Sequence, residues 1–270
     1  MLKRAIVALV SKPGDAPVFE TPGAYGLSFE DVTFTSGDGV RLSGWLIGGA
    51  SDKVIVQTHF GVLSSRSGYT PEGKLLTRAW PKKIRFLRHI KALVEAGYSV
   101  LAYDMRNHGE SGADPRGKVT GGLREAADVI AAVRYINNHP DFSGASIGLL
   151  SLCMGANATT FAFGMENGLA DVPNLAALIA VQPLLMVDQI HAMKIPDMLI
   201  DPASKLNQEK LLVQNRNDPM HNRESIERYF NLLYVEKEMT WLDLEKARLA
   251  AYDYFANDPT EMLTFFGAHV

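Results

Sequence analysis

The sequence predicts an α/β fold in which a mostly parallel central sheet is covered by helices on both faces. Three observations predict it. Apolar runs of strand length alternate with segments whose apolar residues recur at helical spacing. The first two strand-like segments are joined by a short turn and form a hairpin. The later runs are apolar almost throughout, which is typical of strands buried on both faces of a parallel sheet.

The elements follow one another in the order that such a sheet requires. A hairpin comes first, with strands at 27–34 and 40–47 around the turn at 36–39. The strands expected to be buried lie at 53–58, 99–103, 146–150, 176–181, 211–214 and 239–242. The predicted helices cover 84–94 and 123–136, begin again near 155, and end the chain from about 258, where Asp258, Pro259 and Glu261 form a helix-start pattern.

Length and composition are those of an ordinary soluble globular protein, and 270 residues can form one large α/β domain or two small ones. The 270 residues carry a net charge of −3, which gives no reason to expect nucleic acid as a partner. A single cysteine excludes an intramolecular disulfide and fits a reducing compartment. The apolar N-terminal run is too short for a signal peptide, and no run approaches the ~20 residues of a membrane span. We therefore expect a cytoplasmic protein with an N-terminal extension at 1–26, a single domain at 27–270, and a short cap-like insertion at about 184–210.

The one cysteine lies in the segment Ser151-Leu152-Cys153-Met154-Gly155, between an apolar strand and a helix rich in small residues. This spacing is typical of a nucleophile elbow, a sharp strand-to-helix turn usually written Gly-x-Ser-x-Gly. Here serine replaces the first glycine and a thiol takes the nucleophile position. Burial as a small apolar residue is the alternative for Cys153, but the elbow exposes its central side chain, and a helix N-terminus favours a thiolate.

Several polar side chains follow the ends of the predicted strands. Ligands in open α/β sheets bind beyond the carboxyl ends of the strands. The residues that the predicted register places there are His59, Asp104, Cys153, Gln182 and Asp218.

In this context the chain resembles the α/β-hydrolase superfamily over roughly residues 28–268. The segment from Asp104 to Ser111 is similar to the family's Asp-x-Arg-Gly-x-Gly-x-Ser loop, and His59-Phe60 lies where the family has His-Gly before its oxyanion loop. Asp218-Pro219 is similar to the loop of the catalytic acid. A cysteine in the elbow resembles the dienelactone hydrolases of this superfamily.

The resemblance implies a role for each of these positions. Cys153 would be the nucleophile and Asp218 the acid, with Asp188 a weaker substitute and a simple turn residue the alternative for Asp218. The oxyanion hole would use the backbone N–H of Met154 with that of Gly61 or Phe60. His59 would be a structural residue of its loop. The candidates for lining the pocket are His59, His191 and Gln182.

The catalytic histidine is missing from its expected place. The family carries it in the loop after the last strand, here residues 242–248, where the chain has none. His221 follows Asp218 closely, and His191 lies in the insertion. Either could serve as the base, although a solvated surface role is the alternative for both, and His269 is expected at the surface. A standard Cys-His-Asp triad is not predicted.

The segment from Arg66 to Arg88 is basic in an otherwise acidic protein. The positive charge of this segment could belong to a solvated helix face. It could instead attract an anionic substrate, such as a carboxylate or a phosphopantetheine thioester, to the rim of the site. Tyr69 and Trp80 could then form an aromatic wall. No sequence motif for a nucleotide, metal or flavin occurs, so no cofactor or metal is expected.

Two functions remain open from the sequence. One is a Cys153-dependent enzyme that hydrolyses an ester, thioester or lactone carbonyl, or transfers its acyl group, with a displaced or non-standard base. The other is a non-hydrolytic member of the fold that has lost the base and binds a small molecule or acts as a cyclase or isomerase. The small-molecule substrate and the oligomeric state are not encoded in any motif.

Overall fold

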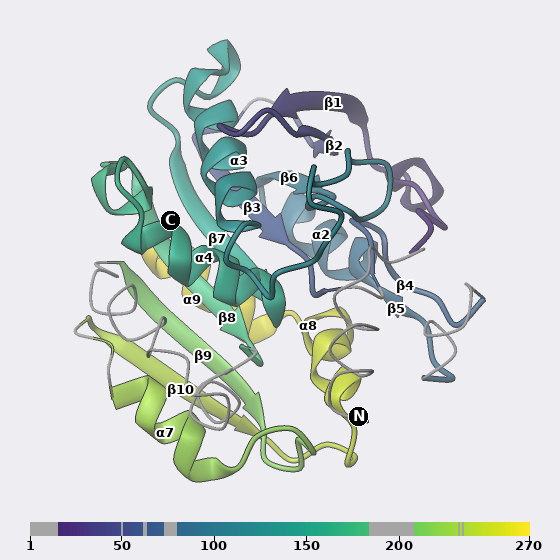
Figure 1. Cartoon of the computed structure of the whole chain (residues 1–270), viewed down its shortest axis with the longest axis vertical. Helices are drawn as coiled ribbons and strands as arrows, with labels where there is room; N and C mark the ends of the chain where they lie inside the picture. Colours follow the sequence, from purple (N-terminus) through teal and green to yellow (C-terminus); the bar gives the residue numbers. More distant parts are fainter. Residues whose placement is uncertain are drawn as a thin grey trace.

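The computed structural model describes residues 16–49, 51–61, 64–72, 80–183, 208–231, 233 and 235–270. Within them, eight strands form one sheet in the order β1-β2-β6-β3-β7-β8-β9-β10 (Figure 1). The β1–β2 and β2–β6 pairs are antiparallel, and all the other neighbouring pairs are parallel. The predicted α/β class with a mostly parallel sheet is therefore confirmed.

The bounds of the elements agree with the predicted order. The strands of the sheet are β1 Phe29–Thr35, β2 Arg41–Ile47, β3 Lys53–Thr58, β6 Ser99–Tyr103, β7 Ser146–Leu152, β8 Leu175–Val181, β9 Glu209–Asn215 and β10 Lys237–Leu242, and a separate ribbon pairs β4 Gly68–Tyr69 with β5 Ile84–Arg85. The helices are α2 Phe86–Glu95, α3 Ala126–Asn138, α4 Met154–Gly164, α7 Arg223–Asn231, α8 Tyr254–Asn257 and α9 Thr260–His269, with 3₁₀ turns η1 Pro22–Tyr25, η3 Pro140–Phe142, η4 Leu169–Asp171 and η5 Arg248–Asp253.

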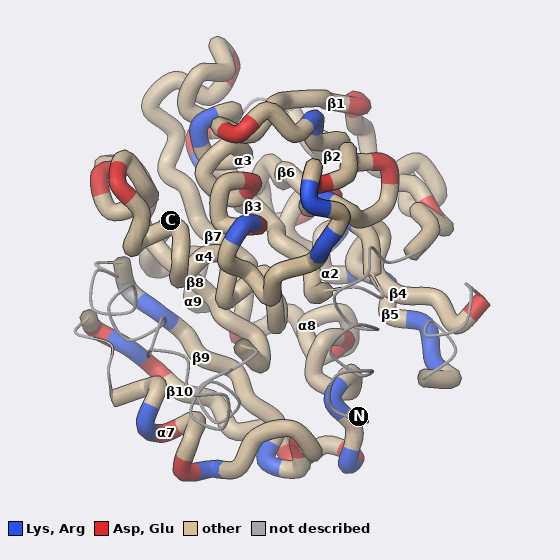
Figure 2. Tube along the Cα trace, in the orientation of Figure 1, with Lys and Arg blue, Asp and Glu red and all other residues tan. Residues whose placement is uncertain are grey.

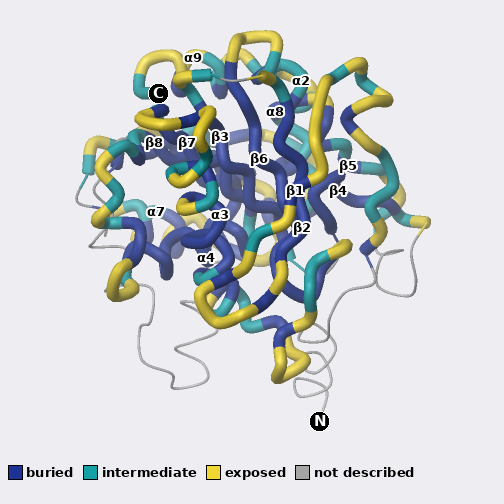
Figure 3. The backbone as a smooth tube through the Cα atoms, turned by 90° about the horizontal axis from the view of Figure 1, so that it is seen from above, coloured by how far each residue is buried: buried dark blue, intermediate teal, exposed yellow. Residues whose placement is uncertain are grey.

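Helices cover both faces of the sheet, as the apolar strands require. Side chains of α3, α4 and α7 join one apolar core, and side chains of α2, α8, α9 and η5 join the other. The inner strands are buried along most of their length, whereas β1 at the edge is largely exposed (Figure 3). The two cores hold the carboxyl ends of β3 and β6 to β10 at one edge of the sheet.

Several boundaries differ from the sequence prediction. The predicted helix at 84–94 begins two residues later, because Ile84 and Arg85 pair with β4 instead. At the start of α9, Oδ1 of Asp258 accepts from the Thr260 N–H at 3.1 Å, but the Glu261 carboxylate accepts from the Thr240 hydroxyl rather than turning back on its helix. A side chain on β10 was thus the better partner for the expected capping residue.

The structure describes only part of the predicted N-terminal extension and of the predicted insertion, so both stay predictions. The described end of the N-terminal extension lies against the domain, where the Phe19 N–H donates to the Ser67 hydroxyl at 3.2 Å and the Ser65 hydroxyl donates to the Pro17 carbonyl at 2.9 Å. Residues 184–207 of the predicted insertion lie outside the described residues, and β9 already begins at Glu209.

A buried arginine organises the loop that follows β6. The Arg106 guanidinium is fully buried and binds three carboxylates, from Asp38 in the β1–β2 turn at 2.6 Å, Asp114 at 3.0 Å and Asp128 in α3 at 2.7 Å. These ion pairs tie the first hairpin and α3 to the end of β6. This is the structural use of the Asp-x-Arg segment that the sequence singled out.

Candidate active site

Cys153 lies at a sharp turn between β7 and α4. It is partly exposed and adopts φ 50° and ψ −108°, a strained left-handed conformation for a non-glycine residue. Two residues later, a Cβ on Gly155 would come within 2.6 Å of the Thr58 carbonyl oxygen and 2.7 Å of the His59 carbonyl oxygen. Glycine is therefore required there, because α4 starts directly against the end of β3. This is the geometry of a nucleophile elbow.

Serine at the first position of the elbow has a local explanation. The buried Ser151 hydroxyl shares a 2.8 Å hydrogen bond with the Thr159 hydroxyl of α4. This hydrogen bond links β7 to α4. A glycine at position 151, as in the Gly-x-Ser-x-Gly pattern, would have no side chain to form it. The departure from Gly-x-Ser-x-Gly at this position is thus accommodated by the helix.

The predicted oxyanion donors lie next to one another. Met154 is the first residue of α4, where N–H groups have no acceptor within the helix. Gly61 lies against it, since a Cβ on Gly61 would come within 2.9 Å of the Met154 sulfur. The backbone of Phe60 and Gly61 therefore borders the start of α4, as the oxyanion prediction requires, although the choice between the two N–H groups stays a prediction.

His59 is held in place within its own loop. Its Nε2 accepts from the Met105 N–H at 3.0 Å, so Nδ1 carries the proton and donates to the Phe60 carbonyl at 2.6 Å. Burial, together with the nearby His108 and Arg66, lowers the pKa of His59 well below its usual value. The neutral ring joins the end of β3 to the loop after β6, which fixes the backbone of the oxyanion loop.

Asp218 lies at the end of β9 with both carboxylate oxygens engaged. Oδ1 accepts from the Met220 N–H at 3.0 Å, and Oδ2 accepts from the Gln214 amide at 3.1 Å. Oδ2 also forms an ion pair with Nη1 of Arg248, and Nη2 of the same guanidinium lies 3.4 Å from the Cys153 sulfur. Arg248 thus stands between the acid and the thiol, where a triad would have an imidazole.

Arg248 is the first residue of η5, in the connection that follows β10. Its Nη2 also donates to the Gln182 carbonyl at 2.6 Å and the Pro183 carbonyl at 3.2 Å. Burial by itself would lower the pKa of Arg248, but electrostatic interactions with Tyr252, Cys153 and the Asp218 carboxylate outweigh it and raise the pKa above its usual value. The guanidinium is therefore a fixed positive charge beside the sulfur.

Two further contacts hold η5 in this position. The Gln182 amide donates to the Arg248 carbonyl at 2.6 Å, and Gln182 itself adopts a left-handed φ of 43° at the end of β8. Phe60 stacks on Tyr252, with ring centroids 4.6 Å apart and an interplanar angle of 19°. Phenylalanine in place of the family's glycine after His59 therefore supports the segment that carries Arg248.

Tyr252 is a second polar group near the sulfur. It is buried, and within the described part of the chain its hydroxyl has no partner at regular hydrogen-bond geometry. Burial raises its pKa well above the usual value; the Arg248 charge opposes this, and the Cys153 charge adds to it. The phenol is thus a neutral group that faces Cys153.

The histidines considered as a possible base differ in how far the structure describes them. His221 lies in the connection from Asp218 to α7 and is 7 % exposed, but among the described contacts of the Cys153 sulfur the polar partner is Arg248. The role of His221 as the base stays a prediction. His191 and Asp188 lie outside the described residues. His269 ends α9, where its ring packs on Phe265.

Arg248 is the functional residue that the sequence analysis missed. Residues 242–248 contain no histidine, and an arginine cannot accept a proton, so it did not match the expected role of a base. The signal was present nevertheless, because an arginine closes the connection that carries the family's base. A search for charge complementary to a thiolate, rather than for a base, would have selected it.

The described residues of the basic segment are paired with acids. Lys82 binds Glu245 at 2.6 Å and Lys83 binds Glu72 at 2.8 Å. Arg85 pairs with Glu20 as well. Figure 2 shows basic and acidic segments interspersed along the trace. These pairs reduce the positive charge available to attract an anionic substrate. The attraction of such a substrate by this segment stays a prediction.

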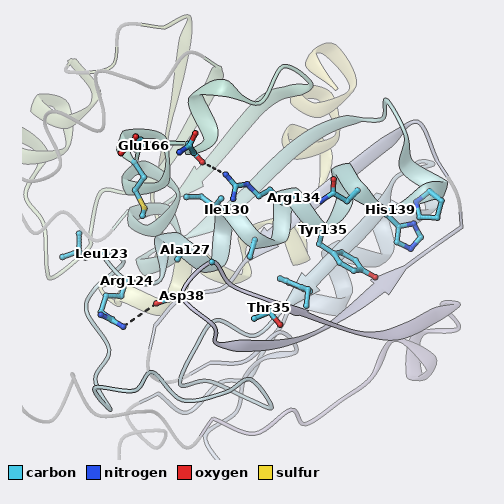
Figure 4. Close-up of a pocket in the computed structure, with 17 residues that line it drawn as sticks. Thr35, Asp38, Leu123, Arg124, Ala127, Ile130, Arg134, Tyr135, His139 and Glu166 are labelled. Carbon is cyan, nitrogen blue, oxygen red and sulfur yellow. Dashed lines mark hydrogen bonds and ion pairs between the residues drawn. The ribbon is translucent and has the colours of Figure 1, made fainter.

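A groove of about 960 Å³ lies away from these residues, between the β1–β2 turn and the outer side of α3 (Figure 4). Its wall includes Leu123, Ile130 and Tyr135, and the ion pair between Arg124 and Asp38 closes one end. Cys153 does not line it. The groove is therefore a separate feature from the elbow.

The described residues show neither a metal-binding cluster nor a membrane-spanning helix. They contain no group of three or more His, Cys, Asp or Glu side chains placed to hold a metal ion. Within the same residues, no helix combines the length and the apolar character that crossing a membrane demands.

Comparisons with solved structures support the fold. An esterase of Pyrococcus furiosus is 23 % identical, with 96 % of each chain covered and a TM-score of 0.70. GrgF of Penicillium, an α/β hydrolase, is 18 % identical over 90 % of this chain and 99 % of that one, with a TM-score of 0.60. A dienelactone hydrolase of Anabaena variabilis is 16 % identical over 88 % and 98 %, with a TM-score of 0.58. At these identities, the likeness concerns the fold alone.

Sequence comparisons give a relative and a family. The polyketide transferase grgF of a Penicillium species is 28 % identical over 155 residues, which span 57 % of this chain and 45 % of the relative. The serine aminopeptidase S33 family matches residues 83–254, more than half of the chain. The matched segment includes the elbow, Asp218 and Arg248. The chain therefore belongs to the serine aminopeptidase S33 family and has the α/β-hydrolase fold.

Proposed function

We propose that this protein is an enzyme in which Cys153 attacks the carbonyl carbon of an ester, thioester or lactone and carries the acyl group as a covalent intermediate. Water or another acceptor then takes the acyl group. The substrate is a small acyl or lactone compound. Hydrolysis and acyl transfer differ only in that acceptor.

One observation carries the proposal: a partly exposed thiol at a strained elbow, 3.4 Å from a guanidinium that is itself held by a buried carboxylate. A positive charge beside a thiol, together with a helix N-terminus, favours the nucleophilic thiolate. Strain at φ 50° costs free energy and persists where the surroundings enforce it, which is common at active sites.

The neighbouring backbone supports the same chemistry. As the sulfur attacks, charge develops on the carbonyl oxygen, and N–H groups aimed at that oxygen stabilise it. The start of α4 at Met154 and the adjoining Phe60-Gly61 backbone are suited to supply them. The relative named as a polyketide transferase, although matched over less than half of its length, favours acyl chains as the transferred group.

The proposal is tested by exposing the wild type to a panel of activated acyl esters, thioesters and lactones and recording intact mass with peptide mapping. One acyl group should be added at Cys153 with at least one class of donor, and Cys153→Ala should stay unmodified. Because the chain has one cysteine, the adduct has one expected site. An unmodified wild type across the whole panel would sink the proposal.

A second function is favoured by one specific contact. An arginine, rather than an imidazole, is the polar partner of the sulfur among the described residues. A protein without a general base would instead bind a small molecule, or isomerise or cyclise it using shape and backbone donors. In that case Cys153→Ala would bind the ligand, or turn it over, as well as the wild type does, whereas loss of both with the thiol excludes this alternative.

A further inference from the structure

We infer that Arg248 makes this site an exchanger of thioesters: it accepts acyl groups from sulfur esters and passes them to thiols, and it works poorly with alkyl oxygen esters and with water. This inference rests on the proposed role of Cys153 as nucleophile. It names the leaving group and the acceptor that the site can handle.

The inference begins with the place that Arg248 occupies. It bridges Asp218 and Cys153, and the same guanidinium donates to two backbone carbonyls at the end of β8. The Gln182 amide and the ring of Tyr252 hold its segment from the other side. A guanidinium with this many acceptors cannot swing away to admit another group between acid and thiol without breaking several hydrogen bonds.

An arginine and a histidine do different chemistry at this point. An imidazole takes the proton from a nucleophile and returns it to the leaving group, an effect of about 10²- to 10⁴-fold. A guanidinium stays protonated at all ordinary pH values, so it can neither accept that proton nor release one usefully. It can stabilise negative charge on sulfur.

The acylation step follows from this difference. The Cys153 thiolate forms a C–S bond with the carbonyl carbon, and the π electrons move to the oxygen. When the C=O bond re-forms, a thioester expels a thiolate that carries its own electron pair and needs no proton. An alkyl oxygen ester would have to expel an alkoxide, which is far more basic than Cys153, so without a proton donor the intermediate returns the cysteine instead.

The second step has the same bias. A thiol acceptor ionises readily near neutral pH, attacks the acyl-cysteine, and releases the Cys153 thiolate, so that one thioester is formed for each one consumed. Water must lose a proton during its attack, and Arg248 cannot accept that proton. The acyl-enzyme should therefore persist in water and discharge to thiols.

Among the described residues, Tyr252 and His221 are the groups that could defeat this inference, and His191, the other histidine expected as a base, lies outside them. The Tyr252 hydroxyl faces the sulfur, but burial raises its pKa well above the usual value, which makes it a poor proton donor. His221 lies on the connection that follows Asp218. All three are therefore included in the test.

The test uses two donors that differ in one atom: the S-acyl ester of N-acetylcysteamine and the O-acyl ester of N-acetylethanolamine, with the same acyl chain. Rapid mixing and intact mass give the rate of acylation of Cys153. The thioester should react at least about 100-fold faster than the oxygen ester, the size of one missing proton transfer. After removal of the donor, the acyl group should remain in buffer and leave when free N-acetylcysteamine is added.

Variants separate charge from structure. Arg248→Gln should lose about tenfold or more of the thioester acylation rate, and Arg248→Lys should recover part of it, because lysine restores a positive charge without the same hydrogen bonds. Arg223→Gln removes an exposed arginine of α7 and should behave as the wild type does. Circular dichroism establishes that each variant is folded.

The outcomes distinguish the inference from the function on which it rests. No acylation by either donor rejects Cys153 as nucleophile. Acylation at similar rates by both donors rejects the inference alone, as does discharge to water as fast as to the thiol. Oxygen-ester activity or hydrolysis that disappears in His221→Ala, His191→Ala or Tyr252→Phe would assign the missing proton transfer to that residue and would also overturn the inference.

Discussion

Two arginines, one fully buried and one with a side chain 12 % exposed, follow strands of the same sheet, and their partners differ. Arg106, after β6, is surrounded by the carboxylates of Asp38, Asp114 and Asp128. Arg248, after β10, has one carboxylate, Asp218, and its other partners are backbone carbonyls and the Cys153 sulfur. Three carboxylates balance the positive charge of Arg106 without any reacting group. Arg248 has one carboxylate, and the Cys153 thiol, when ionised, is a second group that can balance its charge.

We infer from this difference that Arg106 stabilises the fold and that Arg248 acts on the thiol. The Arg106 carboxylates come from the first hairpin, the following loop and α3, so the cation joins three parts of the chain. Burial raises the pKa of Asp128 to about 6, against the opposing pull of Arg106, so that carboxylate depends on its cation. Arg248 joins an elbow to an acid loop, and its removal should affect reactivity more than folding.

The largest effect is expected from Arg106→Met. Without the cation, Asp128 would be buried with uncompensated charge or forced to take up a proton, which costs about 3–5 kcal/mol, whereas Asp114 keeps its ion pair with Arg124 at 2.5 Å. Urea denaturation monitored by circular dichroism measures the loss in unfolding free energy. A loss below about 1 kcal/mol would show that Arg106 is dispensable for folding and would contradict the contrast drawn with Arg248.

Arg248→Gln should cost less, about 1–2 kcal/mol of unfolding free energy, because Asp218 keeps its hydrogen bonds from Gln214 and the Met220 N–H. The same denaturation experiment applies, with Arg223→Gln as the exposed control. A loss as large as that of Arg106→Met would instead make Arg248 a structural residue.

Cys153 offers a test of the strain at the elbow. Glycine tolerates φ 50° better than alanine does, so Cys153→Gly should be about 1 kcal/mol more stable than Cys153→Ala. Both variants lack the thiol, so the difference reports on the backbone alone. Equal stabilities would mean that the elbow stores no strain at this residue.

The smallest effect concerns pH. Hydrogen bonds from Arg106 lower the pKa of Asp38 to about 2. Since the folded-state pKa lies below that of the unfolded chain, ionised Asp38 stabilises the fold fully above about pH 4, and this contribution disappears as the pH falls toward 2. Melting temperatures across this range should therefore fall slightly less steeply in Asp38→Asn than in the wild type. The effect is small because Asp38 is partly exposed and water screens the pair. Identical slopes would remove Asp38 from the Arg106 cluster.

Much of the fold could be predicted because its signals are local. Apolar runs define the strands, and the small residues around Cys153 define the elbow, where the close contact of Gly155 with the end of β3 leaves no room for a side chain. The predicted positions of Asp104 and Gln182 at the carboxyl edge follow from the same alternation of strands and helices.

The partner of the thiol could not be predicted in the same way. Arg248 reaches Cys153 because η5 folds back over the sheet, and that path depends on the stacking of Phe60 on Tyr252 and on the amide of Gln182. These contacts join residues far apart in the sequence. A pattern that looks for histidine in the same loop finds nothing, although the loop does supply a side chain to the site.

The rate constant for alkylation of Cys153 by iodoacetamide measures directly whether Arg248 acts on the Cys153 sulfur. The reagent needs no substrate pocket and has one cysteine to modify. At neutral pH the wild type should react about tenfold faster than folded Arg248→Gln, because the guanidinium lies beside the sulfur that carries the reaction. Equal rate constants in the two proteins would contradict the account.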